Sequence, residues 1–497
     1  MNRHPLVART RRLGLAAALL AGLLPGTARA QDALTLLHQG KIADALVAAE
    51  REAGLRPDDM DAQERWIDLL LGVGLPGIAQ RACAERIAAH PDQADSFYLA
   101  GRAASDVGTS RQHYERALFL DPNHARSWMG LGALDRAVGA WGDAAGAYQH
   151  ALQLNPDLGE AWGGLLAVFS GTGDSAGGLK VARAALTRVP DLAEAWLAIA
   201  TWTPNEGLKV LDEAVTHVPW DTRVQTARAI ALVRANRASE AAAAADKALA
   251  VDPGNRDARL VKMAARAIVG GSLNAKGFDA IAAARTVAPG PAAVAAWDAI
   301  VASWPRCPLG YEGRAHARPA TDSAGARSDL ETALRIDPND DEALAGLGLM
   351  LVTSGDKARA ASLLSRAATA RPYDATLGLG AARAVFESGD KVGALRLGAM
   401  VSAAHPFDLV TVLGFAELQQ RGGDVEAAYQ TVLELAGRVP DLRVQLALAS
   451  AAQQAGHTRQ AADLYDSLAA RTGRAELSAL ARRLRAGLVA PQPQPDP

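Results

Sequence analysis

The sequence predicts an all-α protein whose helices stack as a right-handed solenoid of repeated helix pairs. Three series of residues predict this fold. Prolines, turn glycines and small alanines each recur along the chain, most often at steps of 34 residues. A period of this length is typical of arrays in which each helix pair buries its apolar face against the next pair.

The proline series marks the end of each repeat. A proline ends a helix because it lacks an amide donor and its ring clashes with the preceding turn. Several of these prolines follow Asp or Asn, as in Asp121-Pro122 and Asn155-Pro156, where the polar side chain helps the chain to turn. The series is Pro57, Pro91, Pro122, Pro156, Pro190, Pro219, Pro253, Pro338, Pro372, Pro406 and Pro440.

The other two series predict a tight turn between two helices inside each repeat. Glycine tolerates the left-handed backbone that ends a helix, and Asn236 takes its place once. The alanines follow five residues later, where a small side chain lets two helices approach closely. The turn series is Gly40, Gly74, Gly139, Gly173, Gly270, Gly355, Gly389, Gly423 and Gly456, and the alanine series is Ala45, Ala79, Ala144, Ala241, Ala360, Ala394, Ala428 and Ala461.

The clearest repeat covers residues 125–158. It contains Trp128, Leu131, Gly132, Ala144, Tyr148, Ala151 and Pro156. These residues fill a pattern of a Trp, a Leu-Gly pair, alanines, an aromatic residue and a closing proline, and the repeat thereby resembles the tetratricopeptide repeat family. We count about 13 such repeats over almost all of residues 31–474. The resemblance implies scaffolding or assembly work by protein binding.

The repeat phase fails between residues 271 and 306. Pro289 and Pro305 bracket one helix there. A lone helix would divide the solenoid into a first arm, 31–270, and a second arm, 307–474. A divergent repeat with a lengthened turn is an alternative of equal weight. Leucines at spacings of 3 or 4 predict a capping helix over 475–489, and the Pro/Gln tail, 490–497, is expected to be disordered.

The N-terminus predicts export from a bacterial cytoplasm. Arginines precede an apolar run from Leu13 to Leu24, and Ala28-Arg29-Ala30 offers small residues to a signal peptidase. We expect residues 1–30 to be a signal peptide cleaved after Ala30, which places the protein in the periplasm. An uncleaved anchor is the alternative. A membrane span needs about 20 apolar residues, so none is predicted in the mature chain.

Charge and cysteine content exclude further classes of function. The 52 basic and 54 acidic residues give no basic field, so nucleic acid is not an expected partner. Cys83 and Cys307 lie several repeats apart, and we predict that both are small buried side chains rather than a disulfide.

The sequence carries no motif for catalysis. It has no phosphate-binding loop, no nucleophile turn and no metal-ligand spacing. We therefore predict no enzymatic activity, no metal and no cofactor. A catalytic pocket could still lie in 271–306, and ionisable groups converging on Lys276, Asp279 and Asp298 would indicate one.

The resemblance implies that the first helix of each repeat lines a concave binding face. In the first arm this face is expected to be polar, with Asp61, Glu64, Asp68, Arg126 and Glu194. In the second arm it is expected to be more apolar, and the candidate protein-binding residues are Leu349, Val352, Leu379, Arg383, Phe386, Leu413 and Glu417. Alternatively, these apolar residues only pack helix against helix.

The sequence thus predicts an exported scaffold that binds protein or peptide partners. Similar exported arrays serve envelope assembly and exopolysaccharide secretion, so these are the pathways that the resemblance implies. A groove for a carbohydrate polymer and a regulatory subunit of an envelope enzyme are the alternatives.

Overall fold

The computed structural model describes residues 32–439 and 441–489. The predicted signal peptide and the Pro/Gln tail lie outside these residues. The described part of the chain is all-helical, with 28 α-helices and one short 3₁₀ helix. Contacts between Cα atoms divide it into an N-terminal body, residues 33–404, and a C-terminal body, which runs from His405.

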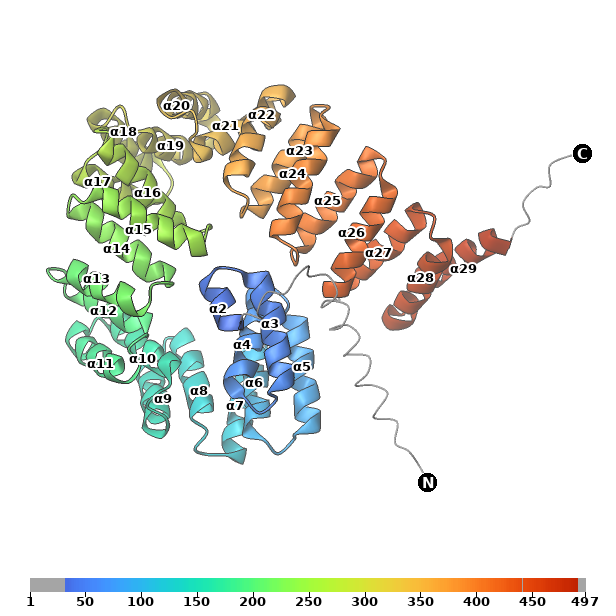
Figure 1. Cartoon of the computed structure of the whole chain (residues 1–497), viewed down its shortest axis with the longest axis horizontal. Coiled ribbons are helices and arrows are strands. Elements are labelled where there is room, and N and C mark those ends of the chain that lie inside the picture. Colours follow the sequence, from blue (N-terminus) through green and yellow to red (C-terminus); the bar gives the residue numbers. More distant parts are fainter. Residues whose placement is uncertain (1–31, 440, 490–497) are drawn as a thin grey trace, which may run out of the picture. The chain divides into compact units, whose positions relative to one another are not determined.

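The N-terminal body is a solenoid of eleven helix pairs and one additional helix (Figure 1). The pairs before residue 290 are α2 (Ala33–His38) with α3 (Ile42–Leu55), α4 (Met60–Gly72) with α5 (Pro76–Ala89), α6 (Ala94–Ala103) with α7 (Val107–Leu120), α8 (Ala125–Ala137) with α9 (Trp141–Leu154), α10 (Gly159–Thr172) with α11 (Ser175–Arg188), α12 (Ala193–Trp202) with α13 (Gly207–His217), α14 (Thr222–Arg234) with α15 (Ala238–Val251), and α16 (Arg256–Val269) with α17 (Ala275–Ala284).

The additional helix, α18 (Pro291–Ser303), stands between the eighth and ninth pairs. After it come α19 (Pro308–Ala317) with α20 (Ser323–Ile336), α21 (Asp341–Ser354) with α22 (Lys357–Ala370), and α23 (Ala375–Glu387) with α24 (Lys391–Ala404). The C-terminal body holds two more pairs and a last helix: α25 (Leu409–Gly422) with α26 (Val425–Arg438), α27 (Leu442–Gln454) with α28 (Thr458–Thr472), and α29 (Ala475–Val489). The thirteen pairs agree with the predicted number of repeats.

The turns within the pairs have the predicted left-handed backbone. Gly40, Gly74, Gly139, Gly173, Gly355, Gly389, Gly423 and Gly456 all have positive φ, and Asn236, at φ 58°, is the one non-glycine residue among those described that does. The prediction was wrong at Gly270, whose φ is −76°. Gly271 takes the left-handed position instead, at φ 70°. It donates to Ile268 O, and Ser272 donates to Ala267 O, so the helix closes one residue later.

The predicted alanine series lies in the core, as its spacing requires. All eight alanines are 0% exposed, from Ala45 to Ala461. Because alanine has only a methyl group as its side chain, the two helices of each pair approach closely at these positions. Cys83 and Cys307 are also buried and unbridged, which confirms that prediction.

The hydrophobic core continues through residues 271–306. This segment contains two helices, α17 and α18, rather than one. Phe278 of α17 and Trp297 of α18 share a core cluster with Ala229 before the segment and with Leu309 after it. The division between the two bodies falls instead at His405.

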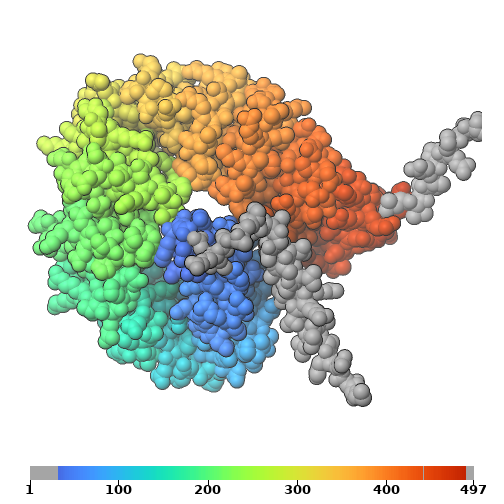
Figure 2. Space-filling model, viewed as in Figure 1, coloured from blue at the N-terminus to red at the C-terminus, as the bar shows by residue number. Residues whose placement is uncertain are grey.

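The start of the N-terminal body touches residues nearly two hundred positions away. The rings of His38 and Trp220 stack with centroids 4.0 Å apart. A Cβ added to Gly40 would overlap the carbonyl oxygen of Val251. In Figures 1 and 2 the blue helices α2 and α3 accordingly lie against the green helices of the same body. The first repeat thus packs against the sixth and seventh repeats.

None of the described helices combines the length and the apolar character that crossing a membrane requires.

Candidate functional site

The first helices of successive repeats form the inner wall of the N-terminal body. They contact one another directly from repeat to repeat: α4 with α6, α6 with α8, α8 with α10, α10 with α12, α12 with α14 and α14 with α16. Helices on the inner side of a curved array lie closest together, and those on the outer side spread apart. Side chains from several repeats therefore meet on this wall.

A network of charged side chains joins four helices of the inner wall. Arg102 of α6 bonds Asp68 of α4, with Nη2 to Oδ2 at 2.6 Å, and Glu160 of α10, with Nη1 to Oε2 at 2.8 Å. Arg126 of α8 bonds Asp61 and also Glu64 of α4, the latter at 3.2 Å. The network therefore spans α4 to α10.

Tyr98 of α6 completes this network. Its hydroxyl donates a short hydrogen bond to Glu64 and accepts one from Arg102 Nη1 at 3.1 Å. Tyr98 is 0% exposed, and the Arg102 guanidinium carbon also lies 6.0 Å from the centroid of its ring. We call the seven residues the inner charge network; they are Asp61, Glu64, Asp68, Tyr98, Arg102, Arg126 and Glu160.

Burial shifts the pKa of two carboxyl groups of the network. Desolvation raises the pKa of Glu64 and that of Asp68, although the neighbouring guanidinium groups of Arg126 and Arg102 oppose the shift. Desolvation favours the neutral form of a carboxyl group because the charged form loses water. Both carboxyl groups are therefore harder to ionise than a carboxyl group in water.

Sequence reasoning found four members of this network and missed three. It named Asp61, Glu64, Asp68 and Arg126, but not Tyr98, Arg102 or Glu160. The missed signal was the period itself, since Tyr98 lies 34 residues after Glu64, and Arg102 lies 34 residues after Asp68. Glu194, also predicted for this face, pairs elsewhere, with Arg223 at 2.6 Å.

A hollow opens beside the inner charge network, with a cavity volume of about 550 Å³. We call it the N-terminal hollow. Apolar side chains of α2 and α3 form one wall, and charged side chains of α4 and α10 form the other. Its lining consists of Leu34, Leu37, Ile42, Asp61, Glu64, Arg65, Asp68, Leu69, Gly72 and Glu160.

The candidate residues of the second arm differ in exposure. Leu349 and Val352 of α21 are 53% and 48% exposed. Leu379 of α23 is only 5% exposed and belongs to the core. Arg383 is exposed, and Phe386 is half-buried with Lys391 Nζ 5.9 Å from its ring centroid. Leu349 and Val352 therefore offer apolar surface to a partner, whereas Leu379 does not.

The last two candidates lie in the C-terminal body. Leu413 of α25 is half-buried and packs against the core cluster that contains Ala416 and Leu448. Glu417 is exposed, with an oxygen 3.9 Å from Arg421 Nη1.

The groups that would have indicated an enzyme in 271–306 do not converge. Asp279 pairs with Arg234 at 2.9 Å, and Asp298 pairs with Arg314 at 2.9 Å. Each carboxylate is thus held by a different arginine on a different helix. Among the described residues, no group of three or more His, Cys, Asp or Glu side chains is placed to hold a metal ion.

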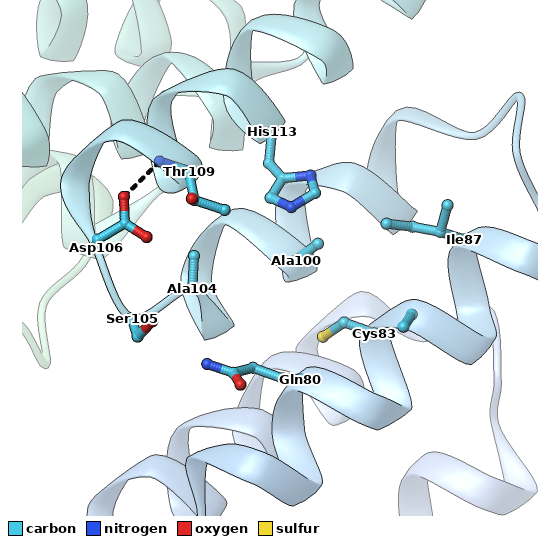
Figure 3. A pocket seen from close by; sticks show the side chains of 10 residues that line it. Gln80, Cys83, Ile87, Ala100, Ala104, Ser105, Asp106, Thr109 and His113 are labelled. Carbon is cyan, nitrogen blue, oxygen red and sulfur yellow. Dashed lines mark hydrogen bonds between the residues drawn. The ribbon is translucent and has the colours of Figure 1, made fainter.

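A second, smaller pocket between α5, α6 and α7 contains a cysteine and a histidine (Figure 3). Cys83, Gln80 and His113 line it, while the Asp106 carboxylate accepts a hydrogen bond from Thr109 N at 2.8 Å. Burial raises the pKa of the Cys83 thiol to about 12 and lowers that of His113. A nucleophilic cysteine needs the thiolate, which this environment disfavours.

Six residues on the first helices share one structural role at the repeat boundary. Each donates a side-chain hydrogen bond to the carbonyl oxygen of the proline six positions earlier. The donor–acceptor pairs are Trp128 with Pro122, Trp162 with Pro156, Trp196 with Pro190, Gln225 with Pro219, Arg259 with Pro253 and Tyr311 with Pro305. The three tryptophans therefore serve the fold.

A family model described as the tetratricopeptide repeat matches residues 102–159 and 316–375. These two segments are therefore similar to tetratricopeptide repeats. A search of curated proteins finds no match. Most helix pairs outside the two segments share the turn, alanine or proline positions, so each described body is a solenoid of helix pairs similar to tetratricopeptide repeats.

Solved structures with detectable similarity include two that cover most of this chain and one that covers about a third of it. Naa15/Naa10 bound to HypK-THB is 16% identical, with 92% of this chain and 77% of that chain covered and a TM-score of 0.30. The APC/C hetero-tetramer Cut9-Hcn1 is 14% identical, with 92% and 89% covered and a TM-score of 0.29. YrrB, a TPR protein with an unusual peptide-binding site, is 18% identical, with 37% and 99% covered and a TM-score of 0.27.

Proposed function

We propose that the chain is an exported scaffold that binds protein or peptide partners on the first helices of its repeats and catalyses no reaction. The observation that carries the proposal is the exposed apolar pair Leu349 and Val352 on α21, at 53% and 48% exposure. Large apolar side chains grouped at a surface gain free energy when a partner removes them from water. Envelope assembly and exopolysaccharide secretion are the pathways we propose for this binding.

Photo-crosslinking in cells tests the binding surface. A crosslinking amino acid placed at Leu349 or at Val352 is expected to join the chain to a partner. Val392, 70% exposed on the second helix α24, is the matched control position. Equal crosslinking at all three positions, or none at Leu349 and Val352, would contradict the proposal for this surface.

Export is supported by the arginines, the apolar run and the Ala28-Arg29-Ala30 sequence at the N-terminus. Expression in a Gram-negative host, followed by fractionation and N-terminal sequencing, tests it. A periplasmic protein that begins at Gln31 is the expected result. Recovery of the uncleaved chain with the membrane fraction would favour an anchor instead.

A carbohydrate-binding groove receives no support from the three tryptophans that recur at steps of 34 residues. Trp128, Trp162 and Trp196 are fixed at repeat boundaries by hydrogen bonds to proline carbonyl groups. We therefore retain protein binding as the single proposal.

A further inference from the structure

We propose that the N-terminal hollow binds a segment of a partner protein in which a Lys or Arg side chain lies beside apolar residues. This inference rests on the proposed binding function and adds the chemistry of the partner. It concerns α2, α3, α4 and α10, and the seven candidate protein-binding residues of the second arm lie on other helices.

The apolar wall of the hollow is accessible to a partner. Leu34 and Ile42 are 45% and 42% exposed, and Leu37 lies between them on the lining. A cavity of about 550 Å³ lies within the size range of ligand pockets. The hollow therefore has room for a few side chains, and those that touch this wall gain by being apolar.

The opposite wall presents carboxylates to solvent and keeps its guanidinium groups covered. Asp61 and Glu160 are the outermost charged groups, with side chains 73% and 58% exposed. Arg102 and Arg126 are only 18% and 23% exposed, and each is already bonded to two carboxylates. A ligand that enters the hollow therefore contacts the carboxylates, which accept hydrogen bonds, before it reaches the guanidinium groups, which donate them.

The charge balance around the hollow is negative. Arg65 is also paired, with Glu52 at 3.0 Å. Apart from that pair, the four carboxylates that line the hollow, Asp61, Glu64, Asp68 and Glu160, are bonded to only two guanidinium groups, those of Arg102 and Arg126. This leaves two carboxylates in excess. A cationic group complements this excess, whereas an anionic one meets like charge.

The two walls together select for a mixed ligand. A free polyamine satisfies the carboxylates but leaves Leu34 and Ile42 in water. A purely apolar segment covers those side chains but leaves the carboxylate excess unpaired and partly desolvated, which is costly. A segment with a Lys or Arg next to leucine-like side chains satisfies both walls.

Fluorescence anisotropy with defined peptides tests the proposal on the chain without its proposed signal peptide. The probe is a fluorescein-labelled peptide of sequence GLRLLRLG. Two matched peptides replace either both arginines by glutamate or all leucines by serine. The probe is expected to bind, with affinity that falls as salt rises, and each matched peptide is expected to bind at least tenfold more weakly.

Variants of the chain locate the site. Asp61→Asn with Glu160→Gln is expected to weaken binding of the probe by about tenfold, because hydrogen bonds to charged groups are lost. Leu34→Ser with Ile42→Ser is expected to weaken it similarly. Asp257→Asn removes an equally exposed carboxylate that pairs with Arg285, and Leu55→Ser removes an exposed leucine, so these two serve as controls without effect.

Three results would overturn the inference. They are no binding of the probe, binding that both pairs of substitutions leave unchanged, and displacement by spermidine at the concentration expected for the peptide. Displacement by spermidine would show that the hollow binds cations in general rather than a mixed segment. None of these results bears on crosslinking at Leu349 and Val352, so the binding function of the chain can stand when this inference fails.

Discussion

Trp162 Nε1 donates a hydrogen bond of 2.8 Å to the carbonyl oxygen of Pro156, six residues earlier. The proline ends one repeat and cannot donate a hydrogen bond of its own, but its carbonyl group still needs a partner. The indole supplies that partner from the first turn of the next repeat. The same relationship recurs at five other boundaries, with Trp, Gln, Arg or Tyr as the donor.

The first prediction is that Trp162→Phe loosens this boundary. Phenylalanine keeps an aromatic ring but lacks the donor, so the expected loss is about 1 kcal/mol of local stability. Amide hydrogen exchange around residues 155–158 measures it. Trp141→Phe is the control, since Trp141 is 38% exposed and lies outside this series. Equal exchange in wild type and Trp162→Phe would show that the bond contributes nothing.

The second prediction concerns the single non-glycine residue with a left-handed backbone. Asn236 has φ 58°, and Ala235 beside it has φ −81°. A left-handed residue with a Cβ pays about 1–2 kcal/mol unless it is Asn or Asp. Asn236→Ala is therefore expected to be about 1 kcal/mol less stable than Asn236→Gly.

The neighbouring position provides a control of opposite sign. Ala235→Gly is expected to destabilise the protein, because glycine gains nothing at negative φ and loses more backbone entropy on folding. Urea denaturation followed by circular dichroism measures all three variants. The same order of stability at both positions would contradict the backbone explanation.

Periodic features of this fold could be predicted from the sequence because each repeat meets the same local requirement. The turn glycines, Asn236 and the buried alanines such as Ala144 follow from backbone sterics and helix spacing, which depend on a few neighbouring residues. The prediction failed at Gly270 because Gly270 and Gly271 are adjacent, and the spacing of the series does not determine which of the two ends the helix.

Features that depend on the curvature of the solenoid could not be predicted. The stacking of His38 on Trp220 and the contact of Gly40 with Val251 need the accumulated rotation of several repeats. Four members of the inner charge network were predicted, and Arg102 could have been found as well, because it shares a register position with Asp68 in the adjacent repeat. Its link to Glu160 bridges two repeats and depends on how strongly the inner wall curves.

The third prediction uses a buried acid that lies outside the proposed sites. Glu312 is 6% exposed, and burial raises its pKa well above the ordinary value of 4.5, with the neighbouring carboxylates of Asp340 and Glu342 adding to the shift. The folded state therefore holds a proton that the unfolded state releases near 4.5. The free energy of unfolding should fall as the pH rises above that value.

Glu312→Gln removes this titration and is expected to flatten the pH dependence. The amide keeps the size of the side chain and is neutral at every pH. Thermal unfolding temperatures of both proteins between pH 5 and 8 test the prediction. Parallel curves for the two proteins would show that Glu312 does not titrate in this range.

The fourth prediction is that both cysteines are unreactive in the folded protein. Burial raises the pKa of Cys83 to about 12 and also raises that of Cys307. The thiolate is the reactive form, so a thiol reagent at pH 8 should modify both residues only after denaturation. Counting modified thiols with and without urea tests this, and rapid labelling of the folded protein would contradict the burial of Cys83.

The fifth prediction separates a strained turn from the contact between distant repeats. Gly40 and Gly74 both have positive φ, at 70° and 78°, so Gly→Ala introduces the same backbone strain at either site. A Cβ at Gly74 meets nothing within 4 Å, whereas one at Gly40 would overlap the carbonyl oxygen of Val251. Only Gly40→Ala should therefore push α2 away from the sixth and seventh repeats.

Amide hydrogen exchange distinguishes the two effects. Both variants are expected to exchange faster in their own turns, by an amount that corresponds to about 1 kcal/mol. Gly40→Ala alone is expected to expose amides around residues 249–253 and to free Trp220 from the His38 ring, which changes the tryptophan fluorescence. If Gly74→Ala had the same distant effects, the contact between Gly40 and Val251 would not be what joins the first repeat to the seventh.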